Sequence, residues 1–165
     1  MQASALNGQL AHLVAELDGA GAPDEALAEF VPSRGIGPFA TAEKFRPLGR
    51  AWRLGVLLLD RSGRLYLVGE VTRAIEPGRA AVNRSALGER RRSLRLAAAR
   101  SYPKGEAVNY GFASVDTSED VVLAASGPLS ESDGAVVIQL EAGAFADLES
   151  YLRERAALLI SGDPF

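Results

Sequence analysis

The chain has 165 residues, 47% of them apolar, and a formal net charge of −3, so it is long enough to bury about two thirds of its unfolded surface around one core. It contains no cysteine and a single histidine, which excludes disulfides, thiol catalysis and an all-histidine metal site. No apolar run approaches the about 20 residues of a membrane span, and no basic N-terminal region precedes an apolar block. We therefore expect a soluble, cytoplasmic protein with no membrane partner, no metal and no other cofactor.

Residues 4–18 have the pattern of an amphipathic helix, and Ser4 is placed to cap its N-terminus. Its apolar side chains recur every three or four positions: Leu6, Leu10, Leu13, Val14 and Leu17. Residues 24–30 favour a short second helix that stops before Pro32. The Gly- and Pro-rich residues 31–39 indicate an irregular connection.

Two β-rich runs follow, residues 51–59 and residues 64–72, with a turn at residues 60–63 between them. Gly63 supplies the positive φ that closes a tight turn, so we predict a β-hairpin. Because side chains alternate along a strand, Glu70 lies on a partly apolar face of the second run.

The second half of the chain alternates between helical and extended patterns. We predict a helix at residues 80–100, strands at residues 106–116, 120–126 and 135–141, and a closing helix at residues 144–159. The core-facing stripe of the closing helix consists of Phe145, Leu148, Leu152, Ala156 and Leu159.

This order of elements predicts an α+β fold. We expect an antiparallel sheet of about five strands with helices packed mainly on one face, because the hairpins are local and the only long crossover is the helix at residues 80–100. A single domain would span residues 1–165. Residues 1–45 would form an N-terminal helical segment and irregular connection, and residues 46–165 the sheet-plus-helices core.

The predicted helix at residues 80–100 lies in the most basic part of the chain. Residues 73–104 hold nine Lys and Arg against two acidic residues, whereas both ends of the chain are acidic. A helical projection gives a core-facing arc of Ala86, Leu87, Leu94, Ala97 and Ala98. A ridge at the margin of this arc is formed by Arg84, Arg91 and Arg95. Asn83 and Arg90 fall inside the arc, and Leu96 lies opposite it.

Arg90 stands out because a guanidinium on a buried stripe must have a partner or open into a cavity. We predict Glu70 as the partner, since it is the acid placed within an otherwise apolar strand. The pair is either purely structural or lines a ligand pocket. Asn109 and Tyr110 point to opposite faces of one strand, so at most one of them shares a cavity with Arg90. The candidate ligand-binding residues are Arg90, Glu70, Arg84, Arg91, Arg95, Asn83 and Tyr110.

Two other patterns do not meet the requirements of the chemistry that they resemble. Ser101 and Lys104 match the Ser-x-x-Lys pattern of serine acyl enzymes, but that chemistry needs both residues on the first turn of a helix, and Pro103 interrupts this segment. The acidic residues around Asp116 lack the fixed spacing of a cation loop. We interpret them as a solvated turn and His12 as a residue at the margin of the first helix.

Residues 49–100, GRAWRLGVLLLDRSGRLYLVGEVTRAIEPGRAAVNRSALGERRRSLRLAAAR, resemble a small group of uncharacterised actinobacterial proteins, some of which are labelled glutaminases. The resemblance covers about a third of the chain. It implies no catalytic residue at any position of this sequence.

Three functions are compatible with these features, and the sequence does not decide whether the protein is an enzyme. The first is a non-enzymatic binding or assembly module that places the Arg-rich helix against an acidic surface, as in a homodimer formed through the basic helix and the acidic flanks. The second is a binding protein or an enzyme for a small anionic ligand, a nucleotide or a carboxylate, with Arg90 and Glu70 at the site. Nucleic-acid binding is disfavoured by the negative net charge and by the lack of aromatic residues among the arginines.

Overall fold

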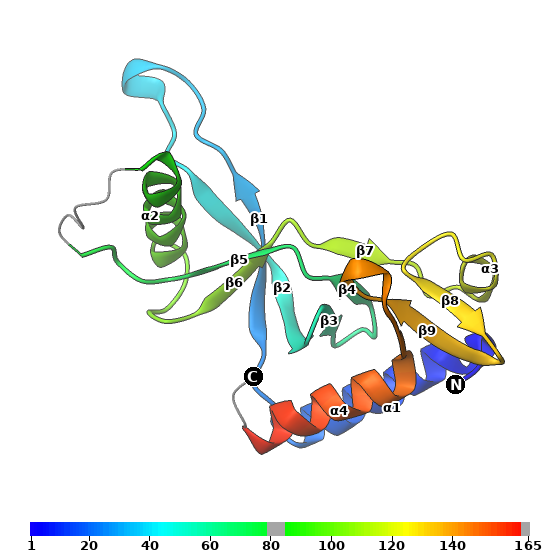
Figure 1. Cartoon of the computed structure of the whole chain (residues 1–165). Coiled ribbons are helices and arrows are strands. Elements are labelled where there is room, and N and C mark those ends of the chain that lie inside the picture. The colour runs from blue at the N-terminus through cyan, green and yellow to red at the C-terminus, as the bar shows by residue number, and fades with distance from the viewer. Residues whose placement is uncertain (79–84, 163–165) are drawn as a thin grey trace. The chain divides into compact units, whose positions relative to one another are not determined.

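The computed structural model describes residues 1–78 and 85–162 (Figure 1). These residues form a seven-stranded mixed sheet, a three-stranded antiparallel sheet and four α-helices. They divide into two compact units. Unit 1 comprises Met1–Asp24, Ala51–Val68 and Ala113–Phe165, and unit 2 comprises Glu25–Arg50 and Gly69–Phe112. The chain passes between the units four times, so neither unit is one continuous segment, and the expectation of a single domain stays a prediction.

Unit 1 contains three helices and most of the strands. The helices are α1 (Leu6–Gly19), α3 (Glu119–Leu123) and α4 (Leu148–Ser161). The strands are β3 (Leu57–Asp60), β4 (Leu65–Leu67), β7 (Ala113–Val115), β8 (Leu129–Ser132), β9 (Ala135–Gln139), β10 (Phe145–Asp147) and the last four residues of β2 (Lys44–Leu54). One apolar core holds them together. Its largest fully buried side chain is Trp52, whose indole Nε1 donates to the carbonyl oxygen of Ala22 at 3.1 Å.

Unit 2 has a smaller core of its own. It is built from α2 (Ala86–Ala99), β1 (Glu25–Val31), β5 (Glu70–Arg73), β6 (Ala107–Tyr110) and the first part of β2. The buried residues of this core are Ala26, Ala28, Phe45, Ala74, Leu94, Ala97, Ala98, Val108 and Tyr110. Small alanines let α2 lie close to the strands, whereas the aromatic rings fill the remaining space.

The α+β class is confirmed, but the sheet is larger than the five strands predicted, and it is mixed. Its strand order is β5-β6-β1-β2-β3-β4-β7, and β1 pairs with β6 in parallel, with Ala26 opposite Val108. The predicted short helix at residues 24–30 is therefore wrong, because this segment is β1. A strand buried on both faces has a continuous apolar run rather than an alternating one, and Ala26, Leu27 and Ala28 form such a run.

The predicted hairpin is confirmed at residues 60–63, where β3 and β4 pair antiparallel. The first β-rich run, residues 51–59, is divided between two strands, however. β2 and β3 pair with each other, and Gly55 and Val56 form the turn between them. Gly55 has a φ of 65°, and the Tyr151 hydroxyl lies over it and accepts the backbone N–H of Val56 at 2.9 Å. A two-residue turn of this kind depends on glycine.

The predicted strands at residues 64–72 and 106–116 are each interrupted at a glycine, at Gly69 and Gly111. β4 pairs with β7 and β5 pairs with β6, all antiparallel and in one continuous register. That register places Gly69 opposite Gly111. A Cβ on Gly69 would lie 2.3 Å from the carbonyl oxygen of Gly111, so the two backbones approach too closely for any side chain.

The C-terminal region departs most from the sequence-based expectation. Residues 120–126 do not form a strand, because α3 begins at Glu119 with two acidic residues in its first turn, a composition that favours helix initiation. Residues 129–132, between α3 and the predicted strand β9, form β8, which pairs with β9. Phe145 lies in β10 and is exposed, whereas the helix starts later, with Asp147 accepting from the N–H of Ser150 at 2.8 Å.

The first helix is confirmed, with Leu6, Leu10, Leu13 and Leu17 buried. The predicted N-cap of this helix is wrong, because residues Ala3–Ala5 form a 3₁₀ turn and Ala5 occupies the N-cap position of α1.

We expect Gly69→Ala to lower the free energy of unfolding by about 2–3 kcal/mol, because the new methyl group meets backbone atoms that cannot move without breaking the strand pairing. Gly78→Ala is the matched control, since a Cβ there meets no atom within 4 Å. Urea denaturation of both variants measures the effect. Equal stability of the two variants would contradict the close approach of Gly69 to Gly111.

Candidate functional site

The first half of α2 extends beyond the apolar core of unit 2. The buried residues of this helix, Leu94, Ala97 and Ala98, all lie in its last two turns. Leu87, predicted on the core-facing arc, is 62% exposed, so this prediction is wrong. The helix starts at Ala86 with the Ser85 hydroxyl accepting the N–H of Gly88 at 3.1 Å, and no side chain in its first two turns is buried among the described residues.

Arg90 belongs to this first half, and its environment explains why an arginine can occupy a core-facing position. Its guanidinium lies over the ring of Phe30, 4.8 Å from the ring centroid, and its Nη1 donates to Glu43 Oε1 at 3.2 Å. The hydroxyl of Ser93 donates to the other oxygen of Glu43. Arg90 remains half-exposed, and the predicted ion pair with Glu70 is replaced by the pair with Glu43. Nothing in the sequence signals this partner, which lies 47 residues away in a segment expected to be irregular.

Glu70 has a different partner, Tyr110. These two residues are opposite each other in the β5–β6 pairing, and the Tyr110 hydroxyl donates to Glu70 Oε2 at 2.6 Å. The Tyr110 ring packs against Phe45 with a centroid distance of 5.1 Å. Burial, together with the hydrogen bond and the negative charge of Glu70, raises the pKa of Tyr110 to about 12, whereas the charge of Arg90 acts in the opposite direction. Tyr110 is therefore a neutral hydrogen-bond donor at physiological pH.

Asn109, Arg91 and Arg95 do not belong to this cluster. Asn109 is fully buried and points to the opposite face from Tyr110, as expected, with its Nδ2 donating to Glu25 Oε2 at 2.7 Å. Asn83 and Arg84 lie outside the described residues. The structure thus brings Arg90 close to Tyr110 through the Phe30 and Phe45 rings, and it places Arg91 and Arg95 on the exposed side of α2.

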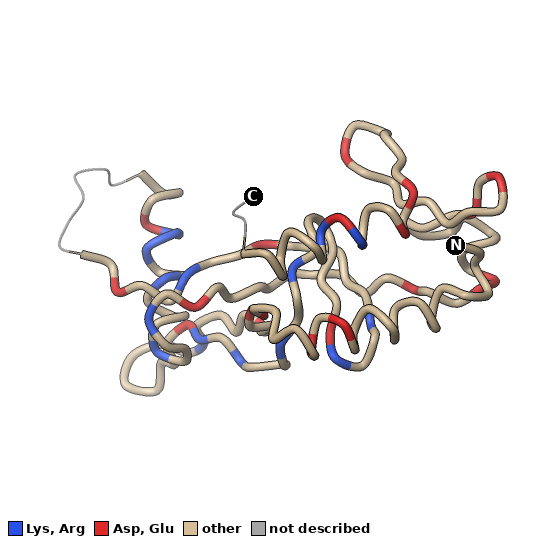
Figure 2. Tube along the Cα trace, turned by 90° about the horizontal axis from the view of Figure 1, so that it is seen from below, with Lys and Arg blue, Asp and Glu red and all other residues tan. Residues whose placement is uncertain are grey.

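The exposed side of α2 forms what we call the basic face, defined by Arg91, Arg92 and Arg95. Figure 2 shows Lys and Arg gathered on this helix. Arg91 and Arg95 are one helical turn apart, and Leu96, 39% exposed, follows Arg92 by one turn. The predicted position of Leu96 opposite the core is confirmed. The basic face therefore combines guanidinium groups with accessible apolar surface.

Charge is divided between the two units. Unit 1 has fourteen acidic residues and five arginines, a net charge of −9, whereas unit 2 has thirteen Lys and Arg and seven acidic residues, a net charge of +6. The sequence showed a basic middle between acidic ends. The structure shows that the acidic ends share one core with residues 51–68, which the linear charge pattern could not indicate.

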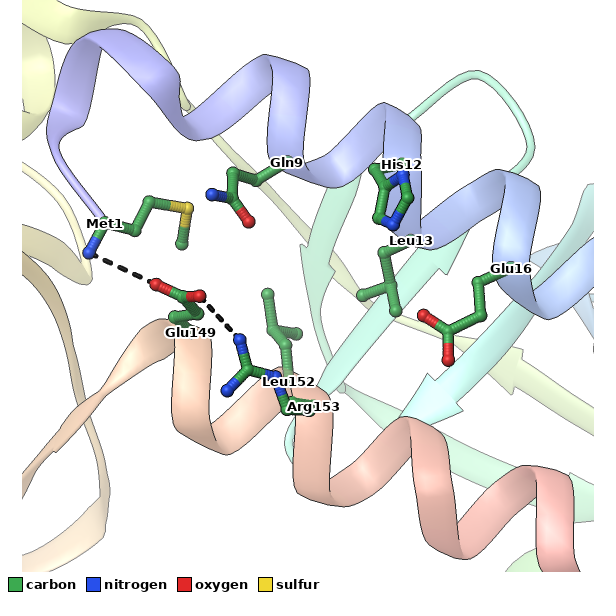
Figure 3. A pocket seen from close by; sticks show the side chains of 8 residues that line it. All are labelled: Met1, Gln9, His12, Leu13, Glu16, Glu149, Leu152 and Arg153. Carbon is green, nitrogen blue, oxygen red and sulfur yellow. Dashed lines mark hydrogen bonds and ion pairs between the residues drawn. The ribbon is translucent and has the colours of Figure 1, made fainter.

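Unit 1 contains a pocket between α1 and α4, with a volume of about 160 Å³ (Figure 3). Its lining residues are Met1, Gln9, His12, Leu13, Glu16, Glu149, Leu152 and Arg153. Leu13 and Leu152 are almost fully buried and provide an apolar floor. Glu149 accepts from Arg153 at 2.7 Å and pairs with the terminal ammonium group at 3.3 Å. His12, expected only at a helix margin, is exposed at the pocket wall. Sequence reasoning missed the pocket because its two helices are far apart in the chain.

Among residues 1–78 and 85–162, no group of three or more His, Cys, Asp or Glu side chains is placed to hold a metal ion. None of the helices in the described part of the chain is both long enough and apolar enough to cross a membrane.

Comparison with known proteins gives no relative: no family model matches the chain, and no curated protein or solved structure matches it significantly. Function is therefore inferred from the geometry and charge of the two units.

We expect Tyr110→Phe to lower the free energy of unfolding at pH 8 by about 1 kcal/mol, the contribution of a hydrogen bond to a partly exposed carboxylate. A tyrosine ionises near pH 10 in the unfolded chain and at about 12 here, so its contribution is complete below pH 10 and disappears as the pH rises to 12. Denaturation at pH 8, 10 and 12 should show the difference between wild type and variant shrinking with pH.

A second variant isolates the role of Glu70. Glu70→Gln removes the negative charge, so Tyr110 should ionise at a lower pH, which absorbance at 295 nm would detect. A difference between wild type and Tyr110→Phe that is constant from pH 8 to 12, or an unchanged titration in Glu70→Gln, would contradict the assigned bond.

Proposed function

We propose that this protein is a non-catalytic assembly module, in which the basic face of α2 binds an acidic protein surface, and that the surface it binds is unit 1 of a second copy of the chain. The observation that carries the proposal is the division of charge, with −9 on one unit and +6 on the other. Two copies of such a chain attract each other when the unit 2 of one faces the unit 1 of the other, because opposite potentials steer the encounter and fix its orientation.

The composition of the basic face supports a protein partner. Arg91, Arg92 and Arg95 are exposed, and Leu87 and Leu96 add apolar surface along the same helix. Arginine is enriched at protein interfaces because its planar fork bonds two carboxylate oxygens at once while its stem covers apolar surface. Arg90, by contrast, contributes to the fold of unit 2, since Glu43 and Phe30 already hold it.

The other functions are less well supported. Binding of a small anionic ligand by Arg90 and Glu70 stays a prediction, and both residues already have partners within unit 2. A nucleic acid would approach unit 2 against the repulsion of a unit with a net charge of −9. A protein partner whose acidic residues are gathered in separate patches, such as a second copy of the chain, avoids this repulsion from unit 1.

We expect the protein to self-associate at 50 mM salt and to dissociate at 500 mM, with a rise of about tenfold or more in the dissociation constant, since exposed charge pairs are screened. Sedimentation velocity measures both values. Arg91→Glu with Arg95→Glu should raise the dissociation constant at 50 mM salt by about tenfold, because two attractive contacts become repulsive.

The control is Lys44→Glu with Lys104→Glu, which changes the net charge of unit 2 by the same four units at exposed positions outside α2. We expect a smaller effect from this pair than from the α2 pair. A chain that is monomeric at every salt concentration, or two variant pairs with equal effects, would count against the basic face as the binding surface.

A further inference from the structure

The connection between β1 and β2, residues 32–43, forms an arm that projects beyond the ends of both strands (Figure 1). Near its tip are two large apolar side chains, Ile36 and Phe39, which are 95% and 88% exposed. Single exposed apolar residues are common on proteins, but two on one projecting tip form the kind of feature that anchors a protein interface.

The arm has a defined conformation. Thr41 donates its N–H to the carbonyl oxygen of Arg34 at 2.7 Å, and the N–H of Arg34 donates to the Thr41 hydroxyl at 3.1 Å. Between them the N–H of Ala40 donates to the carbonyl oxygen of Gly37 at 3.0 Å, which closes a 3₁₀ turn that includes Pro38. A tip that is already ordered loses less conformational entropy when it binds, so its apolar side chains contribute more to affinity.

The pocket of unit 1 has the size and chemistry to accept one of these side chains. A cavity of about 150 Å³ with an apolar lining is large enough for one benzene molecule, and this pocket measures about 160 Å³ over the apolar floor of Leu13 and Leu152 (Figure 3). A phenylalanine ring is the size of benzene. Glu16 at the pocket edge is negatively charged, and Arg34 of the arm is an exposed cation.

We infer that the Phe39 ring of one copy inserts into the pocket between α1 and α4 of a second copy, with Ile36 beside it on the arm. This inference rests on the proposed function, since it requires that copies associate. It is consistent with the division of charge, because the arm belongs to the basic unit and the pocket to the acidic one. The contact adds an apolar anchor to an interface whose charged part is the basic face of α2.

The first test removes the ring. Phe39→Ala should raise the dissociation constant for self-association by about thirtyfold, the effect of losing a central aromatic anchor. Phe145→Ala is the matched control, because Phe145 is also exposed but belongs to β10 of unit 1 and not to the arm. We expect less than a threefold change for the control. Circular dichroism should show both variants folded, since neither side chain is buried.

The second test locates the contact. The chain has no cysteine, so Ala40→Cys, which leaves the neighbouring Phe39 ring in place, and Gln9→Cys each introduce the only thiol of their variant. Gln9 lines the pocket (Figure 3). An equimolar mixture of the two variants, mildly oxidised, should give a disulfide-linked heterodimer in at least fivefold excess over a mixture of Phe145→Cys with Gln9→Cys.

The outcomes separate this inference from the proposed function. If Arg91→Glu with Arg95→Glu weakens association while Phe39→Ala behaves like Phe145→Ala, the inference is overturned and the assembly function stands. Equal cross-linking of Ala40→Cys and Phe145→Cys to Gln9→Cys would also overturn the inference. A wild-type chain that stays monomeric would contradict both the inference and the proposed function. Weaker association of Phe39→Ala together with selective cross-linking would support both.

Discussion

The close approach of Gly69 to Gly111 is the constraint on which the arrangement of unit 2 depends. The two chain segments that contain these glycines pair antiparallel in one register, first as β4 with β7 and then as β5 with β6. A Cβ on Gly69 would overlap the backbone of Gly111, so this pairing requires glycine. Because α2 follows β5 and precedes β6, the pairing of these strands determines where the basic helix can lie.

Within unit 2, aromatic packing separates arginines that stabilise the fold from arginines that are available to a partner. Phe30, Phe45 and Tyr110 form a cluster of tilted rings, and Arg90 covers it while Glu43 balances its charge. The cost of partly burying Arg90 is thereby offset by a cation–π contact and a charged hydrogen bond. Arg91, Arg92 and Arg95 have no such role in the core, which leaves them to the function that we propose for the basic face.

The sequence predicted elements well where the physical signal was local. The periodicity of residues 4–18, the turn at residues 60–63 and the final helix are all present in the structure. Predictions failed where tertiary contacts overrode local preference. The alanine-rich residues 24–30 became the parallel strand β1 because β6 pairs with them, and Arg90 found Glu43 rather than Glu70 because the connection between β1 and β2 brings that carboxylate to α2.

The sequence by itself determined the α+β class, the amphipathic first helix and the concentration of arginine on one helix, since each follows from residue type and short-range spacing. Only the tertiary structure decided which acidic residues share a unit, how far α2 extends beyond its core, and that Phe39 is exposed while Phe45 is buried. The physical reason is that burial and charge balance depend on contacts between residues distant in the chain. Composition and periodicity carry no information about those contacts.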